Sequence, residues 1–338
     1  MRQPRDILSS FLDANANDMR AERLGVGSIN ETWGVTEGGE STPSFVLQQM
    51  HSLFAPHIMQ DILHVTSHLK EKGLLTQEVV RTQSGDLYVP DETSWWRMLT
   101  YVPGNIYQSL PSTQHAHSAG TLVGSFHEAL ADFTTPLVHT LAGFHDTALV
   151  MEKLRRAYDA HKNSPEGKAV SESIETILTQ YAEMPDMSAL PKRIIHGDLK
   201  ISNVCFDTDT DEARALIDLD TLMQASIAIE LGDALRSWCA NGDEDTKHLS
   251  FNTECYTAAV SGYISSATFL TEEERKSIPD GIALITLEIA ARFLTDALEQ
   301  SYFRHDASLY PSLYEQNKTR GENQLSLFKD FKTKRHLI

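Results

Sequence analysis

Two short polar segments in the middle of the chain constrain its fold and chemistry more than any other feature. The first reads HGDLKISN over residues 196–203, and the second reads IDLD over residues 217–220. Apolar residues around them predict short strands at Ile194–Ile195, Val204–Phe206 and Ala213–Ile217, with an acidic turn at Asp207–Glu212 between the last two. A strand, a polar loop and a hairpin would bring the two segments together at one site.

The polar side chains of these segments are those that phosphoryl transfer requires. Such a reaction needs a carboxylate that takes the proton of the attacking hydroxyl, and oxygen ligands for the Mg²⁺ that neutralises the phosphates. We expect Asp198 to be the base, and Asn203 and Asp218 to be the metal ligands. Lys200 is expected to add positive charge at the γ-phosphate. A surface loop with these residue types by chance is the alternative, which the flanking strand and hairpin disfavour.

Three neighbouring residues are expected to support this site or to contact the substrate. His196 is interpreted as a brace of the loop without a role in proton transfer. Asp233 is interpreted as a buried acceptor of backbone N–H groups from the loop. Asp220 is a candidate both for contact with the substrate and for support of the metal ligands.

Composition excludes several classes of protein. The chain has 338 residues, of which 41% are hydrophobic and 22% charged, as in ordinary globular proteins with room for two lobes. A net charge of −18 argues against nucleic acid as a partner. No segment is long and apolar enough to span a membrane, and the first 20 residues do not resemble a signal peptide, so we expect a cytoplasmic protein. Three cysteines without a CxxC pair predict neither a zinc site nor a disulfide framework.

The pattern along the chain predicts an α+β fold with two lobes. Residues 1–102 are expected to form a small antiparallel sheet with one packed helix at Ile58–Lys72 and a short leading helix at Arg5–Ala14. Residues 103–338 are expected to be mainly helical. The helices predicted there include Gln114–Ala131, Leu149–His161, Ser171–Glu183, Gly232–Trp238, Asn252–Ser265, Thr271–Lys276 and Ile282–Phe303. The basic tail, Lys329–Arg335, is expected to be a solvated end.

These features resemble the aminoglycoside phosphotransferase and choline kinase family, which has a two-lobed, protein-kinase-like fold. Within it, the chain is most similar to the N-acetylhexosamine 1-kinases. The similar sequence segments are GSIN at 27–30, VLQQM at 46–50, FHDT at 144–147, IDLDT at 217–221, GDALR at 232–236 and RFL at 292–294. The resemblance extends over nearly the whole chain, from about Gly25 to Tyr302.

The resemblance implies a role for several residues. Asp198 would orient and deprotonate the anomeric hydroxyl of a sugar, and Arg292 and Tyr302 would contact that sugar. Gly27, Ser28 and Asn30 would belong to the turn over the phosphates of ATP. The hinge, with Leu99, Tyr101 and Val102, would hydrogen-bond the adenine through its backbone.

Two of these assignments have alternatives. A cation such as Arg292 on an apolar helix needs a partner, so a buried salt bridge with Glu288 competes with sugar binding. The FHDT segment either lines the acceptor pocket or caps the helix that follows it.

The chain departs from the usual kinase sequence pattern at one position. A phosphate-binding lysine is expected on the third strand, paired with a glutamate of the following helix. Gln48 stands at that position, and the helix offers Gln60 and Asp61 instead of a glutamate. An amide can hydrogen-bond a phosphate but carries no charge, so Lys200 is the candidate for the missing cation.

The sequence therefore predicts a kinase that uses ATP and Mg²⁺ and phosphorylates a sugar, an N-acetylhexosamine at its 1-hydroxyl. One alternative is a kinase of the same fold for another alcohol, such as choline, homoserine, a thiosugar or an aminoglycoside. A second is a catalytically silent nucleotide-binding protein, which the departure at Gln48 would favour. A protein kinase is disfavoured because Ile217-Asp218-Leu219 replaces Asp-Phe-Gly.

Overall fold

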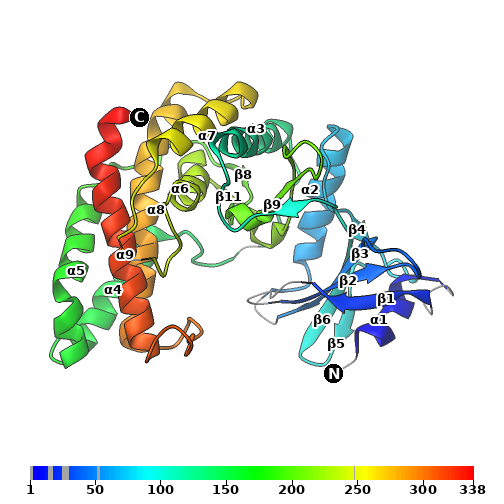
Figure 1. Cartoon of the computed structure of the whole chain (residues 1–338), viewed down its shortest axis with the longest axis horizontal. Coiled ribbons are helices and arrows are strands. Elements are labelled where there is room, and N and C mark those ends of the chain that lie inside the picture. The colour runs from blue at the N-terminus through cyan, green and yellow to red at the C-terminus, as the bar shows by residue number, and fades with distance from the viewer. Residues whose placement is uncertain (1–2, 14–17, 25–29, 52–53, 140, 247) are drawn as a thin grey trace.

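The computed structural model describes residues 3–13, 18–24, 30–51, 54–139, 141–246 and 248–338. Its elements form two lobes, a strand-rich one and a mainly helical one (Figure 1). The predicted α+β, protein-kinase-like architecture, with a small antiparallel sheet before a larger helical region, is confirmed.

The first lobe is built on one antiparallel sheet. Its elements are α1 (Pro4–Phe11), β1 (Arg20–Arg23), β2 (Glu31–Thr36), β3 (Phe45–Met50), α2 (Ile58–Glu71), β4 (Val79–Val80), β5 (Val89–Asp91) and β6 (Ser94–Thr100). The strand order is β1-β2-β3-β6-β4, and β5 pairs with β6. Helix α1 is part of the same chain segment as predicted but ends at Phe11.

Alternation along the strands decides what each face of this sheet covers. Trp96 and Met98 of β6 join Leu47 of β3 in a core with helix α1. Trp95 and Leu99 point to the other face and belong to a second, larger core, which includes α2 and continues into the helical lobe. The two lobes therefore share apolar packing on the face of the sheet that carries the odd-numbered residues of β6.

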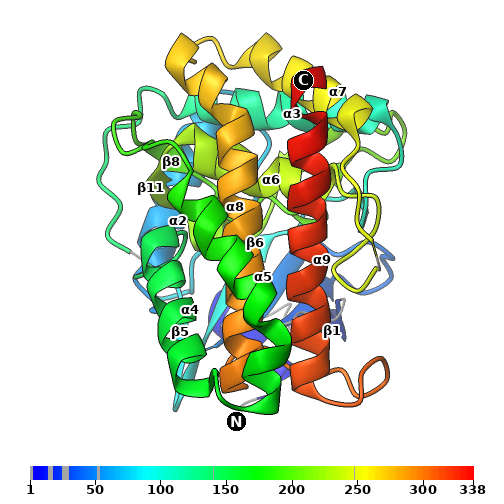
Figure 2. The same cartoon turned by 90° about the vertical axis from the view of Figure 1, so that its left-hand side faces the viewer.

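The second lobe is mainly helical. Its elements are β7 (Asn105–Ile106), α3 (Thr113–Ala129), α4 (Thr147–His161), α5 (Pro165–Ala182), β8 (Arg193–Ile195), η2 (Ile201–Asn203), β9 (Val204–Phe206), β10 (Ala213–Leu216), η3 (Leu219–Thr221), β11 (Met223–Ala225), α6 (Ile227–Trp238), α7 (Thr253–Ser266), α8 (Glu272–Glu299), α9 (Leu313–Lys334) and η4 (Arg335–Leu337). Strands β10, β9 and β7 form one small sheet, and β11 pairs with β8. Figure 2 shows α4, α5, α8 and α9 running side by side.

Helices α8 and α9 differ from the sequence predictions. The two helices predicted over 271–303 are one helix, α8, which runs through Pro279 and starts with a capping box of Thr271 and Glu274. The tail predicted as a solvated end completes α9 instead, because Phe328 and Phe331 are buried against the core. Packing of these apolar faces outweighs the local signals for a break and for a free end.

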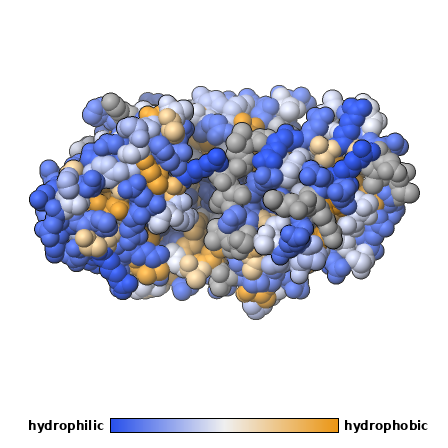
Figure 3. Space-filling model, turned by 90° about the horizontal axis from the view of Figure 1, so that it is seen from below, coloured by the Kyte–Doolittle hydropathy of each residue, from blue (hydrophilic) through white to orange (hydrophobic). Residues whose placement is uncertain are grey.

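No helix in the described ranges is both long and apolar enough to cross a bilayer. Seen from below, hydrophilic residues predominate and hydrophobic ones occur in small groups (Figure 3).

Candidate active site

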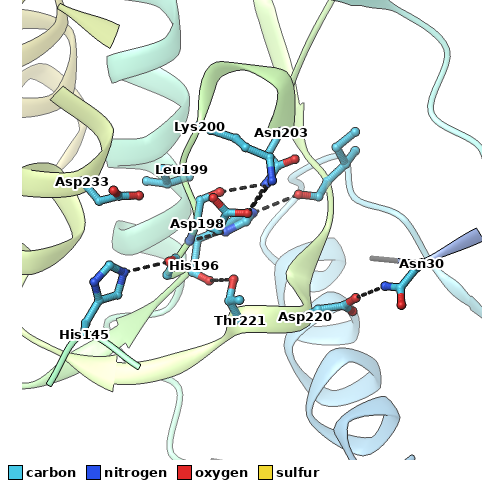
Figure 4. A network of polar contacts seen from close by, with 12 residues as sticks. Asn30, His145, His196, Asp198, Leu199, Lys200, Asn203, Asp220, Thr221 and Asp233 are labelled. Carbon is cyan, nitrogen blue, oxygen red and sulfur yellow. Dashed lines mark hydrogen bonds and ion pairs between the residues drawn. The ribbon is translucent and has the colours of Figure 1, made fainter. Parts of the chain in front are cut away.

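The side chains of Asp198, Lys200 and Asn203 lie together on the central loop (Figure 4). Lys200 Nζ lies 2.6 Å from Oδ2 of Asp198. Nδ2 of Asn203 donates to the backbone carbonyl of Asp198 at 2.8 Å and to its Oδ2 at 3.3 Å. Partial burial lowers the pKa of Lys200, but the charge of Asp198, with smaller contributions from Asp218 and Asp233, raises it overall. Lys200 therefore stays charged beside the candidate base.

Glu230 of α6 holds the start of this loop. Its Oε1 accepts the N–H of His196 at 2.7 Å, and its Oε2 accepts the N–H of Gly197 at 2.9 Å. Burial raises the pKa of Glu230, but His127 and the backbone donors outweigh it, so that the pKa is lowered. The brace predicted for Asp233 was therefore assigned to the wrong residue. Asp233, one turn further along α6, instead accepts a bond from Arg236 at 3.1 Å.

His196 and Gly197 tie the two polar segments together. Nε2 of His196 lies 2.9 Å from the carbonyl oxygen of Ile217, and Oγ1 of Thr221 donates to the carbonyl of His196 at 2.8 Å. Gly197 has φ +82°, and a Cβ there would lie 2.4 Å from the carbonyl oxygen of Thr221. Glycine is required here both by the left-handed backbone and by the close approach.

A buried ion pair supports the loop from the other side. Nε2 of His145 bonds the carbonyl oxygen of Gly197 at 3.0 Å, and its Nδ1 lies 3.3 Å from Oε1 of Glu288 on α8. Burial lowers the pKa of His145, but the bond to Glu288, the charge of Asp233 and the Gly197 carbonyl outweigh it and raise the pKa to about 9. His145 is thus a cation at neutral pH, with Nε2 hydrogen-bonded to the loop and Nδ1 in an ion pair with Glu288.

The residues predicted to hold Mg²⁺ offer suitable oxygen atoms. Asp218 adopts a left-handed conformation, with φ 65° and ψ 57°, directly before η3. Burial and the negative charge of Asp220 raise the pKa of Asp218 to about 6, although Lys200 and Arg97 act in the opposite direction. Asn203 donates its amide N–H groups to Asp198, and its Oδ1 is therefore available as a metal ligand. A buried carboxylate crowded by like charge, such as that of Asp218, and an amide oxygen are both suitable ligands for a hard divalent cation.

Only some of the first-lobe residues that are expected to bind the nucleotide lie within the described residues. Gly27 and Ser28 lie outside the described residues. Asn30 donates through Nδ2 to Oδ2 of Asp220 at 3.3 Å, which links the first lobe to the second. Gln48 donates to Oγ1 of Thr32 at 3.1 Å.

The hinge candidates follow the last strand of the sheet. Leu99 is buried within β6, and the N–H of Tyr101 donates to the carbonyl of Ser44 at 2.9 Å. Val102 is buried against Cys205. Among the described residues, no acceptor receives the backbone N–H of Val102, so this donor is available at the position where an adenine contact is expected.

Arg292 and Tyr302 lie together, whereas the salt bridge of Arg292 with Glu288, which was the alternative to sugar binding, is absent among the described ion pairs. Nη2 of Arg292 donates to Oη of Tyr302 at 3.4 Å, and the guanidinium centre lies 5.7 Å from the centroid of the tyrosine ring. Tyr302 is 66% exposed. Glu288 is engaged by His145 and by Oγ1 of Thr147. Asp146 caps α4 by accepting the N–H of Leu149 at 3.0 Å, as one of the two interpretations of this segment requires.

Sequence reasoning missed three residues that shape this site. Arg97 of β6 forms a buried, bidentate ion pair with Asp220. Glu230 and His145 hold the loop as described above. A charged residue inside the apolar run Trp95–Leu99 signals a buried partner, but nothing in the sequence identifies Asp220 as that partner.

Comparison with known proteins gives a consistent result. Residues 20–257 match the model of the phosphotransferase enzyme family. A homoserine kinase of Beijerinckia indica is 24% identical over 265 residues, which cover 75% of this chain and 77% of that protein. An aminoglycoside phosphotransferase structure from Alicyclobacillus acidocaldarius superposes with a TM-score of 0.64 at 15% identity, covering 100% of this chain and 98% of the other. A choline kinase structure from Cryptosporidium parvum gives a TM-score of 0.63 at 12% identity, with 98% and 96% covered.

Proposed function

The chain belongs to the phosphotransferase enzyme family, and from this premise we propose that it is an ATP- and Mg²⁺-dependent kinase whose acceptor is the 1-hydroxyl of an N-acetylhexosamine. The observation that carries the kinase activity is the convergence of Asp198, Lys200 and Asn203 on one loop. The sheet lobe would hold the nucleotide, and the helical lobe would hold the acceptor. No nucleic acid or membrane takes part, and the cytoplasm supplies ATP.

The proposed mechanism is an in-line transfer. The acceptor oxygen bonds to the γ-phosphorus as the bond from that phosphorus to the β–γ bridging oxygen breaks, and ADP leaves. Asp198 aligns the acceptor hydroxyl and takes its proton. Lys200, which is paired with Asp198, lies close enough to offset negative charge that develops on the phosphoryl oxygens. Asn203 and Asp218 would hold Mg²⁺, which supplies neutralisation of the phosphate charge.

The pair of Arg292 and Tyr302 supports a sugar as the acceptor. An exposed phenol ring offers a flat apolar face, and the guanidinium beside it offers donors to hydroxyl or acetamido oxygens. A cationic acceptor such as choline or an aminoglycoside finds less support. The carboxylates of Glu230, Asp233 and Glu288 are each already engaged by donors of the protein.

Homoserine is the second candidate acceptor, because the related homoserine kinase covers three quarters of the chain. Arg292 forms no ion pair with any described carboxylate, so its fork is available for the carboxylate of an amino acid. The same guanidinium would then serve a different substrate group.

The test is ADP release from MgATP with a panel of acceptors: N-acetylglucosamine, N-acetylgalactosamine, glucose, galactose, homoserine, 3-aminopropanol, choline and kanamycin. We expect turnover with an N-acetylhexosamine and a fall of about 10²- to 10⁴-fold in kcat for Asp198→Asn, the typical contribution of a positioned base. Turnover with homoserine but not with 3-aminopropanol, which lacks the carboxylate, would replace the sugar with the amino acid.

Arg292→Gln provides the matched substrate test. It should raise KM for the productive acceptor and leave KM for ATP unchanged. ATP binding without turnover on any member of the panel, unaffected by Asp198→Asn, would contradict the kinase assignment and favour a silent nucleotide-binding protein.

A further inference from the structure

The position that lacks a lysine on β3 faces an arginine on the neighbouring strand. Gln48 of β3 and Arg97 of β6 are directly paired in the register of the sheet. Nε of Arg97 donates to Oε1 of Gln48 at 2.8 Å. The guanidinium therefore lies beside the end of the Gln48 side chain, at about the place that the ammonium of a lysine at position 48 would reach.

The same guanidinium connects the two lobes. Nη2 of Arg97 donates to Oδ2 of Asp220 at 3.0 Å, and Nη1 bonds Oδ1. Asp220 is two residues beyond Asp218, the candidate metal ligand, and also accepts the bond from Asn30. An ion pair at this point joins the sheet to the metal-binding segment, as a strand lysine and its glutamate join the nucleotide site to a helix in protein kinases.

No other described cation of the first lobe is placed in this way. Arg97 is 1% exposed. The remaining described basic residues up to Thr100 are all exposed, namely Arg5, Arg20, Arg23, Lys70, Lys72 and Arg81. Asp61, the nearest acidic residue to the usual helix position, accepts the backbone N–H groups of Val138 and His139 instead.

A buried ion pair contributes little net stability, because desolvation of both charges offsets most of their attraction. A guanidinium has five N–H donors, and Gln48 and Asp220 occupy three of them. A fourth points at the sulfur of Met59, a weak acceptor, 3.9 Å away. The fork thus keeps one donor without an acceptor, and a second on a weak one, for a further anionic group while its orientation is fixed, which a lysine ammonium with three donors would not do as well.

We propose that Arg97 is the cation that binds the phosphates of the nucleotide in place of the missing β3 lysine, with Gln48 and Asp220 as its positioning residues. This assignment rests on the proposed ATP-dependent function but is independent of the identity of the acceptor. It also assigns Asp220 to the nucleotide side of the site, whereas the sequence left it a candidate both for contact with the substrate and for support of the metal ligands.

The test compares two variants that both lack the buried partner charge. Asp220→Asn keeps Arg97, and Asp220→Asn/Arg97→Gln removes the cation without leaving an unpaired buried charge. Calorimetric titrations with MgATP and with adenosine report binding without turnover. We expect the double variant to bind MgATP about 10- to 100-fold more weakly than Asp220→Asn, and adenosine equally well. Equal loss for both ligands, or no loss for MgATP, would overturn the assignment.

The second test moves the positively charged side chain from one strand to its neighbour. In Arg97→Gln/Gln48→Lys the cation moves from β6 to its register partner on β3, and we expect MgATP affinity to recover to within about 10-fold of the original protein. Failure to recover, with Arg97→Gln itself weakened, would mean that the arginine does not replace the lysine. Arg193→Met is the control, because Arg193 makes a bidentate pair with the buried Glu274 away from the site. It should lower the melting temperature and leave nucleotide affinity unchanged. Absence of MgATP binding by the original protein would overturn the proposed function itself.

Discussion

The ion pair of His145 and Glu288 should make stability depend on pH in the alkaline range. Folding raises the pKa of His145 from an ordinary 6.5 to about 9. Since one pKa unit corresponds to 1.36 kcal/mol, this rise corresponds to about 3 kcal/mol of preference for the charged imidazole in the folded state. His145 is almost fully buried, with a side chain 3% exposed, so solvent screens little of this contribution.

The direction follows from the raised pKa. The folded protein holds the proton of His145 more tightly than the unfolded chain does, so the contribution is complete below about pH 6.5. It decreases as the pH rises and is lost once the pH passes about 9. Because Nε2 of His145 bonds the carbonyl of Gly197, next to Asp198, the catalytic loop should loosen over the same interval.

The assay is urea unfolding of the original protein and of His145→Asn between pH 6 and pH 10. Asparagine is chosen because His145 has φ 51°, which asparagine tolerates better than most residues. We expect the difference in unfolding free energy to fall by about 3 kcal/mol over this range. His139→Gln is the control, because burial and the nearby His57 lower the pKa of His139, and its effect should not decline with rising pH. A constant difference between the original protein and His145→Asn from pH 6 to pH 10 would refute this reasoning.

Two further variants probe the catalytic loop. Gly197→Ala should be more destabilising than Gly73→Ala, since both glycines have φ +82° but only the first has a backbone oxygen 2.4 Å from the added Cβ. The left-handed strain of about 1–2 kcal/mol should appear in both melting curves, and equal losses would contradict the steric argument. Glu230→Gln should lower the unfolding free energy at pH 7 by about 1–3 kcal/mol, because one backbone N–H of the loop loses its acceptor. The pKa of Glu230 is lowered on folding, so its contribution is lost as the pH falls below the ordinary glutamate value of 4.5, and the acid limb of a urea series should be shallower in the variant.

Local sequence patterns were sufficient to predict that Asp198, Lys200 and Asn203 share one loop between a strand and a hairpin. Asp198, Lys200 and Asn203 lie within six residues, so the short strand before them and the hairpin after them fix their mutual position. The helix at Ile58 was predictable for the same reason, because apolar residues recur at helical spacing up to Gly73.

Contacts between distant segments were not predictable in this way. Arg97 and Asp220 are 123 residues apart, and His145 and Glu288 are separated by more than a hundred residues. The sequence does show that each charge needs a partner, because each lies in an apolar context. Which partner each charge finds depends on strand register and helix packing. The sequence prediction named Asp233 and not Glu230 as the acceptor of the loop N–H groups, and the two residues lie one turn apart on α6.

Helix α8 connects the loop of the proposed base, Asp198, to the residues proposed to bind the acceptor. Glu288 holds His145, which bonds the carbonyl next to Asp198. Arg292 follows Glu288 by four residues, one turn or about 6 Å along the same face of the helix, where it contacts Tyr302. A helix that carries both residues would fix the distance from the guanidinium proposed to bind the acceptor to the proposed base, Asp198. Changes in the packing of α8 should therefore alter kcat and acceptor KM together, whereas changes at Gln48 or Arg97, on the sheet, should act on the nucleotide alone.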